Sequence, residues 1–271
     1  MTRNQSLTRP NATAQASIQA QVAVLVTLST LLQCLALLGV LPIAPGSLGR
    51  HVYSTVELLL VAGLLYQGWR IWQWAVATGQ GALVQQVARL CFYSLLLCGL
   101  GDIVNRNYLE RYYQWDEVIR HGYLIQSIVF FFPGYTLVLV ANWLLGAPHV
   151  RPRTVVLGTL AALGVGALAF FGSFDPRVNA LASAAMLAYT LLHAVLVVSV
   201  VWVVRACGWS ASSLVAIGVF LAAVADALIG HFWIFSDHFP VIEHVNWIVY
   251  FASLALIQQL PFLAARAHPA D

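Results

Sequence analysis

Two aspartates stand inside long apolar stretches of the sequence, Asp102 in LCGLGDIVN and Asp226 in FLAAVADALIG. An ionised carboxylate at the centre of a bilayer costs roughly 2.5–3.5 kcal/mol on insertion scales. No cation accompanies either aspartate within its apolar run. A membrane segment retains such a group where it is protonated, is paired, or faces a wet cavity. We therefore predict catalytic roles for both carboxylates.

Two carboxylates in a pocket of low dielectric constant can divide the work of acid–base catalysis, one protonated and the other ionised. Such a pair can protonate a substrate and stabilise a developing cation, or activate water, as in the cleavage of acetal-like bonds. The sequence contains neither a GxSxG nucleophile elbow nor an HExxH zinc helix. Acid–base hydrolysis, with no metal or other cofactor, is the simplest chemistry for these residues.

The composition indicates a membrane protein. Hydrophobic residues make up 61% of the chain and charged residues 8%, whereas soluble proteins have about 25% charged residues. The formal charge is only +3, and the absence of a basic cluster argues against nucleic acid as a partner. Four cysteines lack metal-ligand or disulfide spacing and are interpreted as packing residues: Cys34, Cys91, Cys98 and Cys207.

Apolar stretches of about 20 residues, the length needed to cross a bilayer, occur eight times in the sequence. We therefore predict an all-α polytopic bundle of about eight transmembrane helices, built as one domain over residues 20–265. Residues 1–19 are polar and are expected to form a disordered tail, and residues 266–271 a short C-terminal tail. The predicted spans are 20–43, 52–76, 83–104, 123–147, 154–172, 179–205, 212–235 and 242–265.

An even number of spans places both termini on one side of the membrane. That side would carry eight of the 13 arginines, and the opposite side would carry five. Because arginine excess marks the cytoplasmic face, we predict that both termini are cytoplasmic. The expected location is the bacterial inner (plasma) membrane, which the chain would cross several times.

In this orientation, the ionisable groups that we expect to be buried in the spans all fall in the outer half of the membrane. Polar residues also follow helical spacing in three spans, which places them on one face of each helix. We therefore expect spans 2, 3, 7 and 8 to converge on one pocket, although polar residues also join transmembrane helices to one another. The predicted substrate-binding residues are Glu57, Asn105, Tyr189, Glu243, Asn246 and Tyr250.

Several short motifs of this sequence, in spans 3, 7 and 8 together with Tyr189 of span 6, also occur in a known family. They are Gly101-Asp102, Tyr189, Gly218, Ala225-Asp226-Ala227-Leu228, Phe232, Phe235, Pro240 and Tyr250-Phe251-Ala252-Ser253. In these motifs and in topology, the chain resembles the lysoplasmalogenase-like (YhhN-type) family of eight-span membrane proteins. Family members tend to have Ser-Asp where this chain has Ala225-Asp226, and Tyr-Tyr-x-Ala-Gln where it has residues 249–253.

This resemblance implies hydrolysis of the vinyl-ether bond of a lysoplasmalogen, which gives a fatty aldehyde and a glycerophospho-alcohol. The implied partners are a lysophospholipid-type substrate and the surrounding membrane lipid. Protonation of the vinyl-ether carbon gives an oxocarbenium ion, which a carboxylate can stabilise and water can trap. A single-chain lipid would enter laterally, and we expect Phe130, Phe131, Phe132 and Phe232 to line its path.

Three alternatives remain open at this point. A metal-dependent hydrolase could place Asp226, His231, His238 and His244 around zinc, although helical spacing turns His231 away from Asp226. A transporter or lipid sensor could use the carboxylates as a proton relay. Transporters often contain broken helices, and only Pro133-Gly134 interrupts a span, with no counterpart in span 8. A haem site would require His193 and His231, which are interpreted instead as hydrogen-bonded core residues. The sequence gives no oligomeric state.

Overall fold

The computed structural model describes residues 9–44, 46–105, 124–176, 178, 180–231 and 240–268. All regular structure in these segments is helical, which confirms the all-α prediction. The elements are α1 (Arg9–Leu37), α2 (Leu48–Ala77), α3 (Ala82–Asn105), α4 (Leu124–Gly146), the 3-10 turn η2 (Ala147–His149), α5 (Pro152–Ser173), α6 (Ala180–Cys207), α7 (Trp209–Ile229), α8 (Pro240–Ile257) and α9 (Leu260–Ala267).

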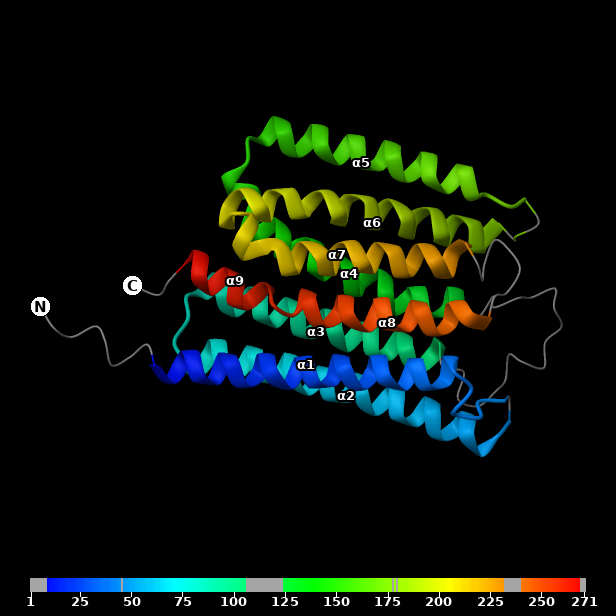
Figure 1. Ribbon diagram of the computed structural model, residues 1–271. Helices are drawn as coiled ribbons and strands as arrows, with labels where there is room; N and C mark the ends of the chain where they lie inside the picture. The colour runs from blue at the N-terminus through cyan, green and yellow to red at the C-terminus, as the bar shows by residue number, and fades with distance from the viewer. Residues whose placement is uncertain are drawn as a thin grey trace, which may run out of the picture.

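Eight helical segments of the described chain are long and apolar enough to cross a membrane, as predicted. A helix satisfies its own backbone hydrogen bonds, which lipid cannot do, and so these apolar sequences form helices. The chain therefore has the architecture of an integral multi-pass membrane protein. Helix α1 begins and α9 ends at the same end of the bundle (Figure 1). We call this the terminal end and the other the opposite end.

Seven helices form a closed ring, in which α1, α2, α3, α4, α6, α7 and α8 each pack against the next and α8 returns to α1. Helix α5 lies outside this ring and packs along α6 (Figure 1). The short helix α9 continues from α8 and packs against α3. Helix α6 therefore packs against both α5, outside the ring, and α7, within it, and α5 and α7 have little contact with each other.

The first helix differs from the prediction at both ends. Residues 9–19 are helical rather than disordered, because Ala and Gln favour helix and Ile18 is buried in the core. The helix ends at Leu37 rather than at residue 43. There Gly39 adopts a φ of 70° and the Val40 N–H donates to the Leu35 carbonyl at 3.0 Å, an arrangement typical of helix C-termini. Residues 1–8 of the expected tail lie outside the described residues.

The predicted last span, residues 242–265, is broken into α8 and α9. Pro261 has no N–H to continue the α8 ladder, but it fits the first turn of a new helix. Gln258 stands at the break, is buried, and donates through Nε2 to the Cys91 carbonyl at 3.1 Å. The expectation that span 8 has no interruption to match Pro133-Gly134 was therefore wrong.

Candidate active site

Asp226 of α7 faces α6, where it meets two side chains. The Tyr189 hydroxyl donates to Asp226 Oδ2 at 3.1 Å, and His193 Nε2 lies 2.8 Å from the same oxygen. Tyr189 and His193 reach one carboxylate because residues four apart share a helix face. The Asp226 side chain is 11% exposed and that of His193 is 7% exposed. These three residues form the Asp226 group, and among the described residues both polar contacts of the carboxylate fall on Oδ2.

The contacts of His193 define where a proton resides. Its Nδ1 lies 3.1 Å from the Tyr189 backbone carbonyl, and a carbonyl can only accept, so Nδ1 carries hydrogen. In that tautomer a neutral imidazole has only a lone pair on Nε2. Nε2 lies 2.8 Å from Asp226 Oδ2 but makes no hydrogen bond to the described residues. A proton carried by either atom would lie next to the other.

Two tyrosine rings fix the imidazole of His193. The ring centroids of Tyr135 and His193 are 4.6 Å apart, and those of Tyr189 and His193 are 4.5 Å apart, both in edge-on packing. Tyr135 belongs to α4 and is completely buried. Helices α4 and α6 thus hold the ring in one orientation toward α7, which keeps Nε2 next to Asp226.

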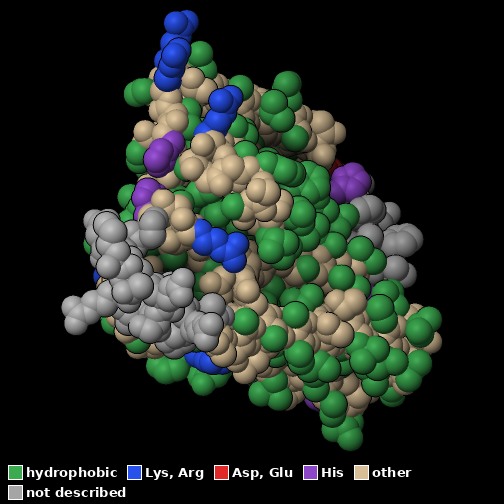
Figure 2. Space-filling view, turned by 60° about the vertical axis from the view of Figure 1, so that its left-hand side comes forward, with side chains coloured by type: hydrophobic (Ala, Val, Ile, Leu, Met, Phe, Trp, Pro, Cys, Tyr) green, Lys and Arg blue, Asp and Glu red, His purple; other side chains and the backbone are tan. Residues whose placement is uncertain are grey.

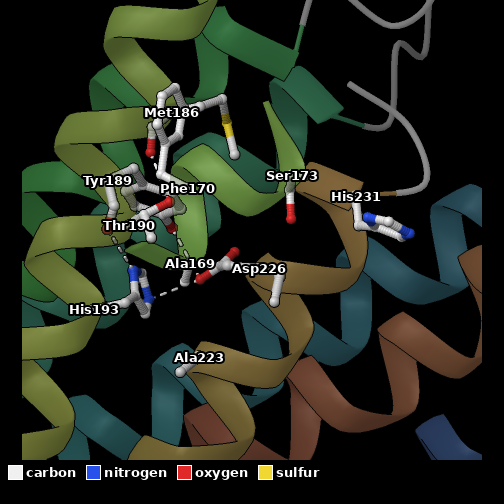
Figure 3. Close-up of a pocket in the computed structure, with 12 residues that line it drawn as sticks. Ala169, Phe170, Ser173, Met186, Tyr189, Thr190, His193, Ala223, Asp226 and His231 are labelled. Atoms are coloured by element: carbon white, nitrogen blue, oxygen red, sulfur yellow. Dashed lines mark hydrogen bonds and ion pairs between the residues drawn. The ribbon is translucent and has the colours of Figure 1, made fainter. Parts of the chain in front are cut away.

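A pocket of about 140 Å³ opens beside the Asp226 group, at the junction of α5, α6 and α7. We call it the outer pocket. Its wall is mostly apolar and includes Phe170, Met186 and Ala223. Figure 3 shows the Asp226 carboxylate reaching from α7 toward Tyr189 and His193, while the His231 ring points away from it. This orientation of His231 agrees with its predicted helical spacing.

A second, smaller cavity of about 20 Å³ also borders Asp226, and we call it the inner cavity. It extends to Asn105, the last residue of α3, and to Ser127 and Phe131 of α4. Asp226, Tyr189 and Met186 line both cavities. The structure thus brings two predicted substrate residues, Asn105 and Tyr189, together with Asp226. Phe131 lies at this site, whereas Phe232 is outside the described residues.

Asp102 belongs to a different group of side chains. The Tyr250 hydroxyl of α8 donates to Asp102 Oδ2 at 2.9 Å, a bond that joins α8 to α3. Asp102 is buried and lines neither the outer pocket nor the inner cavity. Cys98 lies within electrostatic range of both Asp102 and Asp226. The two carboxylates therefore border the same part of the interior, but each is bonded to its own tyrosine. Asn246 is buried one turn before Tyr250.

Glu57 and Glu243 lie in a third group, between α1, α2 and α8. Glu57 is fully buried and accepts from Gln33 Nε2 at 2.7 Å. Gln33 Oε1 in turn accepts from the Tyr53 hydroxyl at 2.5 Å and lies 2.8 Å from His244 Nδ1. Near this network Glu243 pairs with Arg50 at 3.3 Å. The eight predicted site residues are thus divided among three groups rather than gathered in one pocket.

Sequence reasoning assigned no site role to His193 or Gln33. The spacing of Tyr189 and His193, four residues apart on one helix, indicates a shared face. Gln33 is an amide within an apolar run, which in a membrane needs a partner. Neither pattern names that partner, because the rotation of one helix relative to another is decided by packing.

The alternatives involving metals gain no support from the described segments. Among these residues, no group of three or more His, Cys, Asp or Glu side chains could hold a metal ion. His238, named in the zinc alternative, lies outside the described residues, as does the whole segment 106–123.

The chain matches no protein-family model, no curated protein and no solved structure. The resemblance to lysoplasmalogenase-like proteins therefore stays a prediction, based on the short motifs given above. The arrangement of side chains around Asp226 provides the basis for a functional assignment.

Proposed function

We propose that this protein is an integral-membrane lipid hydrolase that cleaves the vinyl-ether bond of a lysoplasmalogen-type lipid by acid–base catalysis. The observation that carries the proposal is the close approach of His193 Nε2 to Asp226 Oδ2, 2.8 Å apart, on the wall of the outer pocket. A positioned proton donor is what the first step of this reaction needs. Asp226 and His193 are the catalytic pair in this assignment.

The reaction begins when the pair transfers its proton to the vinyl-ether carbon that is not bonded to oxygen. The carbon–carbon double bond supplies the electron pair, and the other carbon becomes an oxocarbenium ion. The Asp226 carboxylate, now without its proton, stabilises this cation. Water then adds to the cationic carbon and returns a proton to the pair. The resulting hemiacetal divides into a fatty aldehyde and a glycerophospho-alcohol.

The outer pocket suits the reacting end of a single-chain lipid. At about 140 Å³ it is smaller than the roughly 300–1,000 Å³ of pockets that enclose a whole drug-sized ligand. The hydrocarbon chain would therefore lie outside it, in the surrounding lipid. Helices α5 and α7 expose large apolar side chains that suit this environment, among them Leu168 of α5 and Phe220 of α7, 75% and 59% exposed.

The proposed orientation places the terminal end in the cytoplasm and the protein in a bacterial inner membrane. Figure 2 views the molecule with the terminal end turned forward and shows arginine and histidine side chains among apolar ones. Exposed arginines at helix ends on this side include Arg89, Arg205 and Arg266, in line with arginine excess on the cytoplasmic face. The outer pocket, which includes Ser173 at the last turn of α5, would then open toward the outer leaflet.

A lipid panel tests the proposal. Purified protein in nanodiscs is given a lysoplasmalogen, the matched lysolipid with a saturated alkyl ether, and the matched lysolipid with an ester. We expect aldehyde from the vinyl ether alone, because only that bond forms an oxocarbenium ion on protonation. Thr27→Val, on the exposed face of α1, should match the wild type, and Asp226→Asn prepared in parallel should release aldehyde about 10²–10⁴-fold more slowly. Absence of aldehyde with the wild-type protein would refute the proposal.

A proton-coupled transporter is the second candidate, favoured by the break between α8 and α9 and by Pro133 inside α4. Interrupted helices commonly form substrate sites in transporters. Proteoliposomes with an imposed pH gradient would distinguish the two functions. A transporter would move protons or lipid across the bilayer without changing any covalent bond, whereas the proposed hydrolase releases aldehyde without a gradient.

A further inference from the structure

The inner cavity has the size of a single water molecule. Its volume is about 20 Å³, and a site needs roughly 10–15 Å³ of this kind of volume to hold one water. Neither a lipid headgroup nor an acyl chain fits such a space. The cavity shares Asp226 with the outer pocket, so the carboxylate lies between the two.

The lining of the inner cavity provides the polar partners that a buried water requires, which number two to four. Asn105 Oδ1 is buried and has no hydrogen-bond partner among the described residues. Ser127, 2% exposed, places a second polar side chain at the cavity. Asp226 supplies a third, because its two contacts both fall on Oδ2. The remaining wall includes the apolar side chains of Phe131 and Ile128 and the ring of Tyr189, whose hydroxyl donates to Asp226.

We propose that the inner cavity binds the water that completes hydrolysis, and that Asn105 is the residue that positions it. This inference rests on the proposed function. The water oxygen forms a bond to the oxocarbenium carbon in the outer pocket, and one water proton passes to the Asp226 carboxylate that has just lost its own. Each turnover thus restores the proton of the Asp226–His193 pair. The Asn105 carbonyl accepts the second water hydrogen and aims a lone pair at the cation.

The wall between the two cavities contains Met186 and Tyr189. Met186 is a flexible thioether side chain, and its methyl group lies against Gly230, where an added Cβ would come within 2.8 Å of it. Within this proposal, movement of the Met186 side chain would help the water to reach the outer pocket.

Asn105→Leu tests this assignment, with Asn142→Leu as the matched control. Asn142 is also a buried amide whose Oδ1 has no partner among the described residues, but it belongs to the α4–α6 contact and lines neither cavity. We expect kcat of Asn105→Leu to fall about 100-fold, the loss typical of a misplaced reactant. Its KM should stay within about 3-fold, because the water does not hold the substrate in the ground state. Asn105→Asp keeps an acceptor oxygen and should recover most of kcat.

A readout without substrate separates this inference from the proposed function. High-resolution structures of the wild type and of Asn105→Leu in nanodiscs should show one ordered water between Asn105 and Asp226 in the first and none in the second. If the wild type holds this water but cleaves no lipid, the hydrolase proposal fails and the water site stands. If the wild type holds no water there, or if Asn105→Leu keeps its full kcat, the inference is overturned. The wild-type structure decides the matter even if the variant does not fold.

Discussion

The hydrogen bond from Tyr250 to Asp102 should stabilise the bundle more than a neutral hydrogen bond of the same length. It spans 2.9 Å between α8 and α3, and both residues are buried. The neutral bond for comparison joins Asn142 Nδ2 of α4 to Ser199 Oγ of α6, also at 2.9 Å between fully buried residues. The two bonds differ mainly in the charge that an ionised Asp102 brings to its acceptor oxygen.

The expected energies follow from that difference. Couplings between neutral partners in membrane bundles average about 0.6 kcal/mol, with a maximum near 1.7. Bonds to charged groups contribute about 1.5–3 kcal/mol. We therefore expect a coupling of about 1.5 kcal/mol for Asp102–Tyr250 and about 0.6 kcal/mol for Asn142–Ser199. Tyr250→Phe keeps the ring contact with Phe131, whose centroid lies 5.9 Å away, and so removes only the hydroxyl.

Reversible unfolding in bicelles, followed for each single and double variant, gives both couplings from two double-mutant cycles. The variants are Asp102→Asn with Tyr250→Phe, and Asn142→Ala with Ser199→Ala. A coupling for Asp102–Tyr250 no larger than that of the neutral pair would refute an ionised Asp102 that stabilises the interior through Tyr250. It would also remove the reason to separate Asp102 from the catalytic role given to Asp226.

Two further variants test the packing around the site. Gln33→Leu removes a side chain that contacts Glu57, Tyr53 and His244, and it should lower the free energy of unfolding by about 2–3 kcal/mol. The control Thr27→Val, on the exposed face of the same helix, should change this free energy little. Equal effects of the two variants would show that the Gln33 network does not hold α1 in place. Gly101→Ala places a Cβ 2.8 Å from the Phe131 ring and should cost about 1–3 kcal/mol, while Gly164→Ala meets nothing within 4 Å and should be neutral or stabilising. Thermal unfolding of the four variants measures both effects, and a neutral Gly101→Ala would contradict the close α3–α4 packing.

The eight spans were predictable because hydrophobicity and length alone decide which segments can cross a bilayer. The ends of the helices were less predictable, because Gly39 and Pro261 end or interrupt a helix within a continuous apolar run. The carboxylates could be named as candidates because a charge in hydrocarbon needs a reason. The partners of the carboxylates, His193 and Tyr250, could not be predicted. They are set by the rotation of each helix and by the position of α5 outside the ring, and both depend on packing along whole helices.

The central claim is that the proton shared by Asp226 and His193 is delivered to carbon, and hydrolysis in heavy water tests it most directly. The aldehyde product is trapped by reduction as it forms, and the deuterium on the carbon next to the former carbonyl is analysed. We predict one deuterium per molecule in a single configuration, because a fixed donor in the outer pocket reaches one face of the double bond. Asp226→Asn should lower this turnover by about 10²–10⁴-fold, the usual contribution of a general acid. Aldehyde with both configurations in equal amounts, or with no deuterium at that carbon, would contradict the account.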